Sequence, residues 1–392
     1  MTRFLKSWGL RLIGLVAGIL ALSGLGMAGT KYVVTNDDSA FPFPTGVSIY
    51  AVGANGLPVF QQRVATGGFG IGGGYFGMNR IAVLNRSDQQ CVYSTEAGSG
   101  NIVGISLTTF TVGGIATGSN TDAGTSNGIG LALNNNYLYA SFSDSNTIGT
   151  FQIQSGCSLA FIGDTSAVGL GGGGINAMAL HGTMLITTYT DGSIESFDIS
   201  GGTPLSNGDK QASSARVKSQ GAIYANSVDI TSDGHYALFG DTSTSFNVEI
   251  SDISSGKLTK TTVYKSMASI SSSTVMLSPD ESLLYVINTQ GASVSALFFD
   301  KNAGKLSGGC TSNAVKGLSK NYSYLTGVSL INQTGNGGGV YVAEFGSSSG
   351  IAMVTLTSSG KKCMMQEVSG SPVSDINSPG LLSIGTYPPR SF

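Results

Sequence analysis

Short runs of alternating apolar and polar residues recur along the chain, each followed by a turn of small residues and Gly. Val47-Ser48-Ile49-Tyr50 precedes Asn55-Gly56, and Ile194-Glu195-Ser196-Phe197 precedes Gly201-Gly202. Alternation with a period of two, bounded by turn formers, is typical of β-strands. A second apolar run lies before each of them, in seven copies: Tyr32 to Thr35, Cys91 to Ser94, Leu138 to Ser141, Leu185 to Thr188, Tyr236 to Phe239, Leu284 to Ile287 and Val340 to Ala343.

The repeating unit is about 50 residues long, which is typical of the blades of a β-propeller. With the strands of a blade called a, b, c and d from the axis outward, the first copy begins at its b strand, with no a strand before it. The chain ends with an unpartnered apolar stretch from Gly380 to Tyr387. We therefore predict an all-β, seven-bladed propeller of four-stranded blades, in which this stretch closes the ring beside Tyr32 to Thr35. The second unit departs from the pattern, because Thr108-Thr109 stands where a Gly turn is expected.

The strand and turn residues carry a family resemblance. Tyr32-Val33-Val34-Thr35-Asn36, and the run from Leu277-Ser278-Pro279-Asp280 through Leu284-Tyr285-Val286-Ile287-Asn288, resemble repeats of the YVTN and lactonase-like propellers. That family includes bacterial 6-phosphogluconolactonase. The resemblance covers residues 29–392 and implies the fold more strongly than an activity, because one fold hosts many functions.

Residues 1–28 are typical of an export signal, with a basic start, an apolar run from Leu12 to Leu22 and small residues ending at Ala28. We expect cleavage after Ala28 and a single propeller domain over 29–392, located in the periplasm or outside a bacterial cell. An uncleaved membrane anchor is the alternative, since Leu12 to Ala28 approaches the length of a membrane span.

Composition narrows the function classes. Charged residues make up 11% of the chain and 58 positions are Gly, so we expect almost no helix. The net charge is −2, or about −5 without the leader, and no Lys/Arg cluster is present. This balance argues against a nucleic-acid partner. We expect a monomer whose partner is a small molecule or a component of the envelope or exterior.

The chain has four Cys, an even number that permits disulfides in an exported protein. Cys91 and Cys157 both fall near the face of the a–b and c–d turns, in neighbouring blades, which makes them the preferred pair. The other connectivities and buried free thiols remain open. No CxxC spacing is present, and with only two His a Cys/His zinc site is not expected.

Acidic residues follow the b strands at the opposite face, where the b–c and d–a loops lie. Six of seven blades place a carboxylate there, which predicts a region of negative potential that could bind a cation or a polyhydroxyl compound. Ca²⁺ is the natural metal for such oxygens, with Asp191 and Asp241 as first ligands; no other cofactor is expected. The alternative is that Asp and Asn simply form turns. The candidate ligand-binding residues are Asp37, Asp38, Glu96, Asp144, Asp191, Asp241, Asn288 and Glu344.

Catalysis needs a base, an acid or a metal in addition to carboxylates. His181 and His235 fall in a–b turns, on the other face, and none of the arginines outside the leader lies in a b–c loop, so a phosphorylated-sugar site is not visible. No catalytic residue is transferred from the family. We expect an exported, non-catalytic binding module. The alternative is a lactonase-like hydrolase or isomerase that acts on a sugar lactone.

Overall fold

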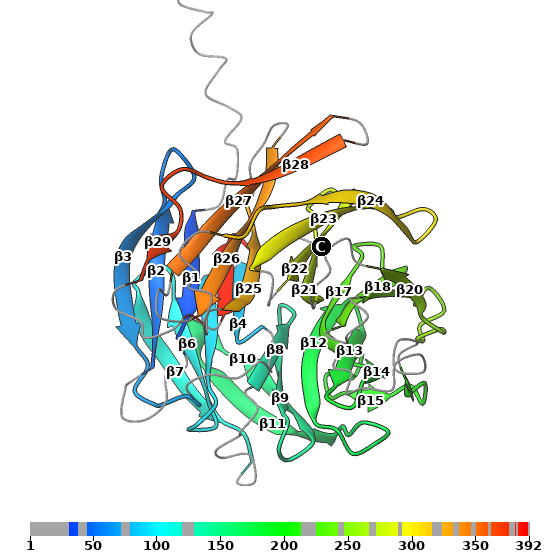
Figure 1. Cartoon of the computed structure of the whole chain (residues 1–392). Helices are drawn as coiled ribbons and strands as arrows, with labels where there is room; N and C mark the ends of the chain where they lie inside the picture. The colour runs from blue at the N-terminus through cyan, green and yellow to red at the C-terminus, as the bar shows by residue number, and fades with distance from the viewer. Residues whose placement is uncertain are drawn as a thin grey trace, which may run out of the picture.

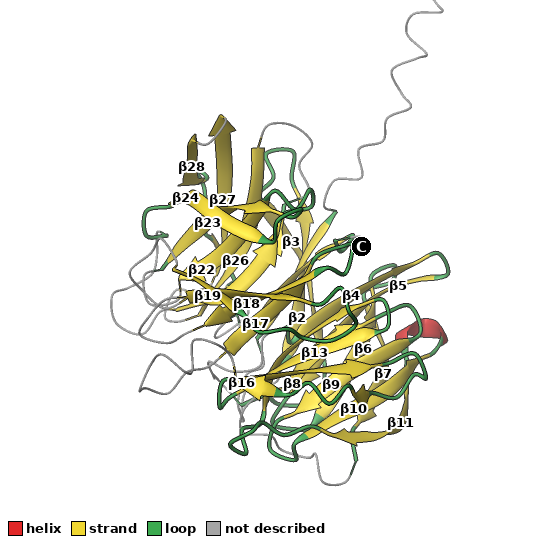
Figure 2. Ribbon diagram, turned by 90° about the vertical axis from the view of Figure 1, so that its right-hand side faces the viewer, coloured by secondary structure: helices red, strands yellow, loops and turns green. Residues whose placement is uncertain are grey.

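The protein forms seven antiparallel sheets arranged as the blades of a propeller (Figure 1). This computed structural model describes residues 31–37, 45–71, 79–119, 129–212, 225–241, 247–265, 272–288, 292–315, 324–331, 337–345, 350–359, 362–375, 381 and 383–390. The predicted signal, residues 1–28, lies outside them. Among the described residues the one helical element is a 3-10 turn, η1 (Ser155–Cys157), which Figure 2 shows in red. No described helix has the length and apolar character to cross a membrane.

Each blade runs from an inner a strand to an outer d strand. In order from a to d, blade 1 consists of β30 (Ser383–Tyr387), β1 (Tyr32–Asn36), β2 (Gly46–Val52) and β3 (Pro58–Ala65), blade 2 of β4 (Ile81–Arg86), β5 (Gln89–Glu96), β6 (Asn101–Ser106) and β7 (Thr111–Thr117), and blade 3 of β8 (Ile129–Leu133), β9 (Tyr137–Phe142), β10 (Thr147–Ile153) and β11 (Leu159–Ser166). Blade 4 consists of β12 (Ile175–His181), β13 (Met184–Tyr189), β14 (Ser193–Asp198), and β15 (Leu205–Ser206) with β16 (Gln211–Ala212), and blade 5 of β17 (Ala225–Ile230), β18 (Tyr236–Asp241), β19 (Asn247–Asp252) and β20 (Thr262–Lys265). Blade 6 consists of β21 (Ser272–Leu277), β22 (Leu283–Asn288), β23 (Ser293–Asp300) and β24 (Lys305–Thr311), and blade 7 of β25 (Tyr324–Leu330), β26 (Gly337–Phe345), β27 (Gly350–Ser359), and β28 (Lys362–Glu367) with β29 (Val373–Ser374).

The predicted ring closure is confirmed. β30 pairs antiparallel with β1, from Tyr32 opposite Tyr387 to Asn36 opposite Ser383, so the last strand completes the first blade. Lys31 N–H adds a hydrogen bond of 2.7 Å to the Tyr387 carbonyl. This pairing leaves β1 without a free edge.

The hydrophobic core lies between the blades. Seven clusters of buried side chains each join two neighbouring blades, because the period-two alternation of the strands places apolar residues on both faces of every sheet. Blade 7, for example, packs Val342 against Ile287 of blade 6 on one face and Tyr341 against Val33 of blade 1 on the other.

Two blades depart from the expected four continuous strands. In blade 4 the outer strand is divided into β15 and β16, which both pair with β14. Asp209 lies in the interruption, and its carboxylate accepts hydrogen bonds from Ser196 N–H at 3.0 Å and from Leu258 N–H, in blade 5, at 2.7 Å. A side chain thus replaces part of the backbone ladder here. In blade 7 the short β29 pairs with β27 beside β28.

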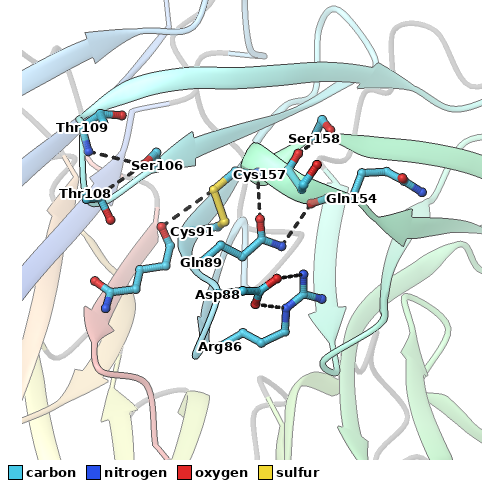
Figure 3. Close-up of a disulfide and its surroundings, with 12 residues drawn as sticks. Arg86, Asp88, Gln89, Cys91, Ser106, Thr108, Thr109, Gln154, Cys157 and Ser158 are labelled. Carbon is cyan, nitrogen blue, oxygen red and sulfur yellow. Dashed lines mark hydrogen bonds and ion pairs between the residues drawn. A yellow bond between two sulfur atoms is a disulfide. The ribbon is translucent and has the colours of Figure 1, made fainter.

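The c–d turn of blade 2 lacks Gly, as the sequence indicated. Ser106 Oγ accepts hydrogen bonds from the N–H groups of Thr108 and Thr109, at 3.2 and 3.3 Å, and Phe110 takes the positive φ (55°) that Gly provides elsewhere (Figure 3). A Ser hydroxyl therefore stabilises a turn that blade 1 and blades 3 to 6 form with Gly.

Two disulfides join neighbouring blades. Cys91 of β5 is bonded to Cys157 of η1, with an S–S distance of 2.00 Å and Cα atoms 5.6 Å apart, and this is the pair that the sequence favoured (Figure 3). Beside it, the Gln89 side chain donates to the Gln154 carbonyl and accepts from Cys157 N–H. The second disulfide joins Cys310 of β24 to Cys363 of β28. No described Cys is free.

Candidate functional site

The face formed by the b–c and d–a loops carries the acidic positions predicted from the sequence. Glu96, Asn288 and Glu344 occupy equivalent places, since each pairs with the first residue of the next strand in its blade. Asp37 follows β1, while Asp144 and Asp191 lie in the b–c loops after β9 and β13. Asp241 ends β18, but its side chain lies outside the described residues, as does Asp38. The strand register therefore brings the described positions of the set to one face.

Glu96 and Asp191 stabilise the loops that lead into their own blades. The buried Glu96 accepts hydrogen bonds from Gly68 N–H at 2.9 Å and Thr45 Oγ1 at 2.8 Å, both in blade 1. Asp191 accepts from the N–H groups of Gly171 and Gly173. A Cβ on Gly173 would lie 2.6 Å from Asp191 N, so this approach requires Gly.

The electrostatics of Asp191 agree with this structural role. Its burial alone would raise the pKa, but hydrogen bonds from Ser193 and from the N–H groups of Gly171 and Gly173 outweigh burial and lower the pKa of this carboxyl. Asp191 is therefore ionised at neutral pH, with its charge directed at the d–a loop between blades 3 and 4.

Asp37 and Asn288 also have partners within their own blades. Asp37 accepts a hydrogen bond from Gly46 N–H at 2.9 Å and forms an ion pair with Arg63. The Asn288 amide donates to the hydroxyls of Ser293 and Ser295, at 3.2 and 3.0 Å. The Asp144 side chain is exposed to solvent.

Glu344 differs from the other members of the set whose side chains the structure describes. It is 0% exposed, and neither carboxyl oxygen has a hydrogen-bond partner among the described residues. Burial, and secondarily the charge of Glu367, raises its pKa to about 8. Glu344 is therefore mostly a neutral acid at pH 7 and can exchange a proton near physiological pH.

The surroundings of Glu344 explain its raised pKa. Residues of β26 alternate between two faces, and Val340 and Val342 pack against Ile287 and Val294 of blade 6. Glu344 has the same parity and lies on this apolar face. Glu96 accepts hydrogen bonds from a hydroxyl and an N–H group at the equivalent interface, whereas the buried Glu344 accepts none from the described residues, which disfavours its charged form.

The two His lie on the opposite face of the propeller, whereas one buried Arg lies on the candidate face. His181 ends β12 and His235 lies in the next a–b turn, so both occur on the opposite face, as predicted. Arg80 was not predicted as a residue of this face, because arginines were sought only in the b–c loops. Arg80 directly precedes β4 in the d–a connection, which shares the candidate face, and it is 1% exposed. Its position before an inner strand is the signal that could have identified it.

Metal binding by this face stays a prediction. Within the described ranges, no group of three or more His, Cys, Asp or Glu side chains is placed to hold a metal ion. Of the two proposed Ca²⁺ ligands, Asp191 directs its oxygens to N–H and hydroxyl groups of the neighbouring loop.

Three comparisons place this geometry among known proteins. Residues 91–371 match the model of the family described as lactonase, 7-bladed beta-propeller. No curated protein matches the chain in sequence. A candidate 6-phosphogluconolactonase from Bacteroides uniformis superposes with a TM-score of 0.64 at 11% identity, over 91% of this chain and 99% of that one.

Two further solved structures share the fold. A functionally unknown protein from Desulfotomaculum acetoxidans gives a TM-score of 0.63 at 12% identity, over 91% of this chain and 99% of its own. The periplasmic gluconolactonase of Pseudomonas aeruginosa gives 0.53 at 13% identity, over 71% of this chain and 81% of its own. The family model spans well over half of the sequence, and the chain belongs to the lactonase family of seven-bladed β-propellers.

Proposed function

We propose that this protein is an exported hydrolase that opens the ring of a sugar lactone at the face of the b–c and d–a loops. The observation that carries the proposal is Glu344, a buried carboxyl without a hydrogen-bond partner among the described residues and with a pKa of about 8. Family membership supports it, as do structural neighbours whose names are those of gluconolactonases. This proposal replaces the non-catalytic binding module that the sequence favoured.

Lactone opening requires a base and then an acid at one place. In our proposal, ionised Glu344 removes a proton from water as the water oxygen adds to the lactone carbonyl carbon. The bond between that carbon and the ring oxygen breaks, and Glu344 returns the proton to the ring oxygen. The product is the open hydroxy acid. A pKa near the working pH suits a group that must both accept and donate a proton.

The substrate class follows from the cations on this face. Arg63 is engaged with Asp37, and Arg80 is almost fully buried. Lys210 donates to the Val168 carbonyl at 2.7 Å and lies 3.1 Å from the Glu195 carboxylate. With these described cations engaged or buried, the proposal favours an uncharged sugar lactone over a phosphorylated one.

Export is part of the proposal. Two disulfides join blades 2 to 3 and 6 to 7, and disulfides persist in oxidising compartments. The predicted signal over residues 1–28 supplies the route. Periplasmic or extracellular localisation is tested by expressing the full chain and assaying cell fractions for the processed protein.

The test of activity is hydrolysis of glucono-δ-lactone, followed by acid release and corrected for the spontaneous reaction. We expect saturable turnover, with kcat/KM rising toward a plateau above pH 8 as Glu344 ionises. Glu344→Gln should abolish turnover, while His235→Ala, on the opposite face, should leave it unchanged. Turnover retained by Glu344→Gln would remove Glu344 from the mechanism. Saturable binding of the lactone without turnover by the wild-type protein would favour the non-catalytic binding module.

A further inference from the structure

The other face of the propeller holds a pair of carboxylates that no part of the proposed reaction uses. Asp229 lies near the end of β17 in blade 5, and Glu281 lies in the a–b turn of blade 6. Their side chains are 13% and 2% exposed. Two acidic groups buried to this extent are costly unless a cation is bound between them.

The cation is an arginine from the other end of the chain. Arg390 Nη1 donates to Asp229 Oδ2 at 2.6 Å, and Arg390 Nη2 donates to Glu281 Oε1 at 2.9 Å. The same guanidinium lies within 3.3 and 3.4 Å of the carbonyls of Ile230 and Leu277. Carboxylates and carbonyls therefore surround a planar group whose N–H donors have a fixed fork geometry.

Glu281 has contacts other than Arg390 that orient its carboxylate. Its backbone has a φ of 56°, unusual for a residue with a side chain. Its carboxylate also accepts a hydrogen bond from Ser232 N–H, in blade 5, and Lys301 lies 3.7 Å from its other oxygen. Asp229 Oδ2 likewise accepts from Leu277 N–H at 2.7 Å. The acceptors are thus oriented by groups other than Arg390.

Arg390 reaches these groups from blade 1. β30 ends at Tyr387, on the a–b side, and Pro388 and Pro389 lead directly to Arg390. Blades 5 and 6 are not neighbours of blade 1 in the ring (Figure 1). The tail therefore connects opposite sides of the propeller, and the two prolines restrict the conformations available to the unbound tail.

We propose that Asp229 and Glu281 form a binding site for the guanidinium group of an arginine, which Arg390 occupies as an intramolecular ligand that locks the ring. The lock acts in addition to the β1–β30 pairing, because it fastens blade 1 to the blades across the axis. The site takes a guanidinium rather than an ammonium ion, since its two carboxylates and two carbonyls are arranged around the two terminal NH₂ groups of one planar group.

The first test compares melting temperatures. Arg390→Ala should lower the midpoint by roughly 5 °C, because it leaves Asp229 without its cation and Glu281 with the more distant Lys301 alone. Arg390→Lys should recover only part of the loss. Arg86→Ala is the matched control, since Arg86 pairs with the exposed Asp88, and it should shift the midpoint by less than about 1 °C. An unchanged midpoint in Arg390→Ala would overturn the proposal.

The second test separates a guanidinium site from simple packing of the tail. Guanidinium chloride at roughly 10 mM, far below its denaturing range, should raise the midpoint of Arg390→Ala but not of wild type or Arg86→Ala. Sodium chloride at the same concentration controls for ionic strength. The peptide Pro-Pro-Arg-Ser-Phe should bind to protein ending at Tyr387, while Pro-Pro-Lys-Ser-Phe should bind at least tenfold more weakly. Equal binding of the two peptides, or no rescue by guanidinium, would contradict a guanidinium site.

Discussion

Tyr32 and Tyr387 lie directly opposite each other in the ladder between β1 and β30, although 355 positions separate them in the sequence. Their rings are 6.3 Å apart, and the Tyr387 hydroxyl donates to Asn85 Oδ1 in blade 2 at 3.0 Å. The last strand thus bonds to the first strand and contacts the second blade. Folding of blade 1 therefore requires the two ends of the chain to meet, which makes the fold depend on a contact of very high sequence separation.

The first prediction concerns this closure. Ending the chain at Asp375 removes β30 and leaves the inner edge of β1 unpaired, so we expect aggregation or loss of a cooperative thermal transition. Ending it at Tyr387 keeps β30 and is the matched control, which should stay soluble with a lower midpoint. Light scattering and calorimetry distinguish the two. A chain ending at Asp375 that melts like the control would show that β30 is dispensable.

The sequence predicted most of the scaffold because strand alternation and turn chemistry are local. The seven copies and the closing strand follow from the period of the repeat, and the turn face assigned to Cys91 and Cys157 made them the preferred pair, which the structure has. The sequence could not predict the interruption of blade 4. Asp209 accepts hydrogen bonds there from Ser196 N–H in its own blade and from Leu258 N–H in blade 5. Such contacts depend on how blades pack, which no local pattern records.

At the candidate site, too, the sequence could not predict contacts between blades. Glu96 and Glu344 are the same residue type at equivalent strand positions, and the sequence treated them alike. They differ in their hydrogen bonds: the preceding blade offers donors to Glu96, whereas no described residue donates to Glu344. The role of Arg390 was equally hidden, because its partners lie more than 100 residues away.

A second prediction follows from the disulfide between blades 2 and 3. Replacing Cys91 and Cys157 together by Ala should destabilise the protein by about 2–4 kcal/mol, since the bond closes a long loop in the unfolded chain. Denaturant titration measures the loss. Reductant should then have a smaller further effect on this variant than on wild type, because only the Cys310–Cys363 bond is left to reduce. An unchanged midpoint of unfolding would mean that the bond adds no stability.

A third prediction concerns Gly104, against which the turn at Cys157 packs. A Cβ on Gly104 of β6 would lie 1.8 Å from the Cys157 carbonyl oxygen, so Gly104→Ala must displace the turn that carries the disulfide. We expect a loss of roughly 2–3 kcal/mol from this overpacking. Gly163→Ala, in β11, is the control, because a Cβ there meets nothing within 4 Å. Equal stability of the two variants would show that the turn can move at little cost.

The last prediction concerns the pH dependence of stability, and it tests Glu344 without an activity assay. The ordinary pKa of a Glu is 4.5, and in the folded protein the pKa of Glu344 is raised to about 8. Between these values the folded state holds a proton that the unfolded chain has released, so this group makes stability fall as pH rises from about 4.5 to 8. Glu344→Gln keeps the shape of the neutral acid but cannot ionise. The variant should match wild type near pH 4 and exceed it by on the order of 4 kcal/mol at pH 8. Glu96→Gln is the matched control, and it should destabilise the protein at both pH values, because Oε1 of Glu96 accepts from Thr45 and Gly68 while Oε2 accepts from Asn101 Nδ2, and an amide nitrogen in place of either oxygen cannot accept. A stability difference between Glu344→Gln and wild type that does not change with pH would show that Glu344 ionises normally in the folded protein, and would remove the basis for its proposed role in proton transfer.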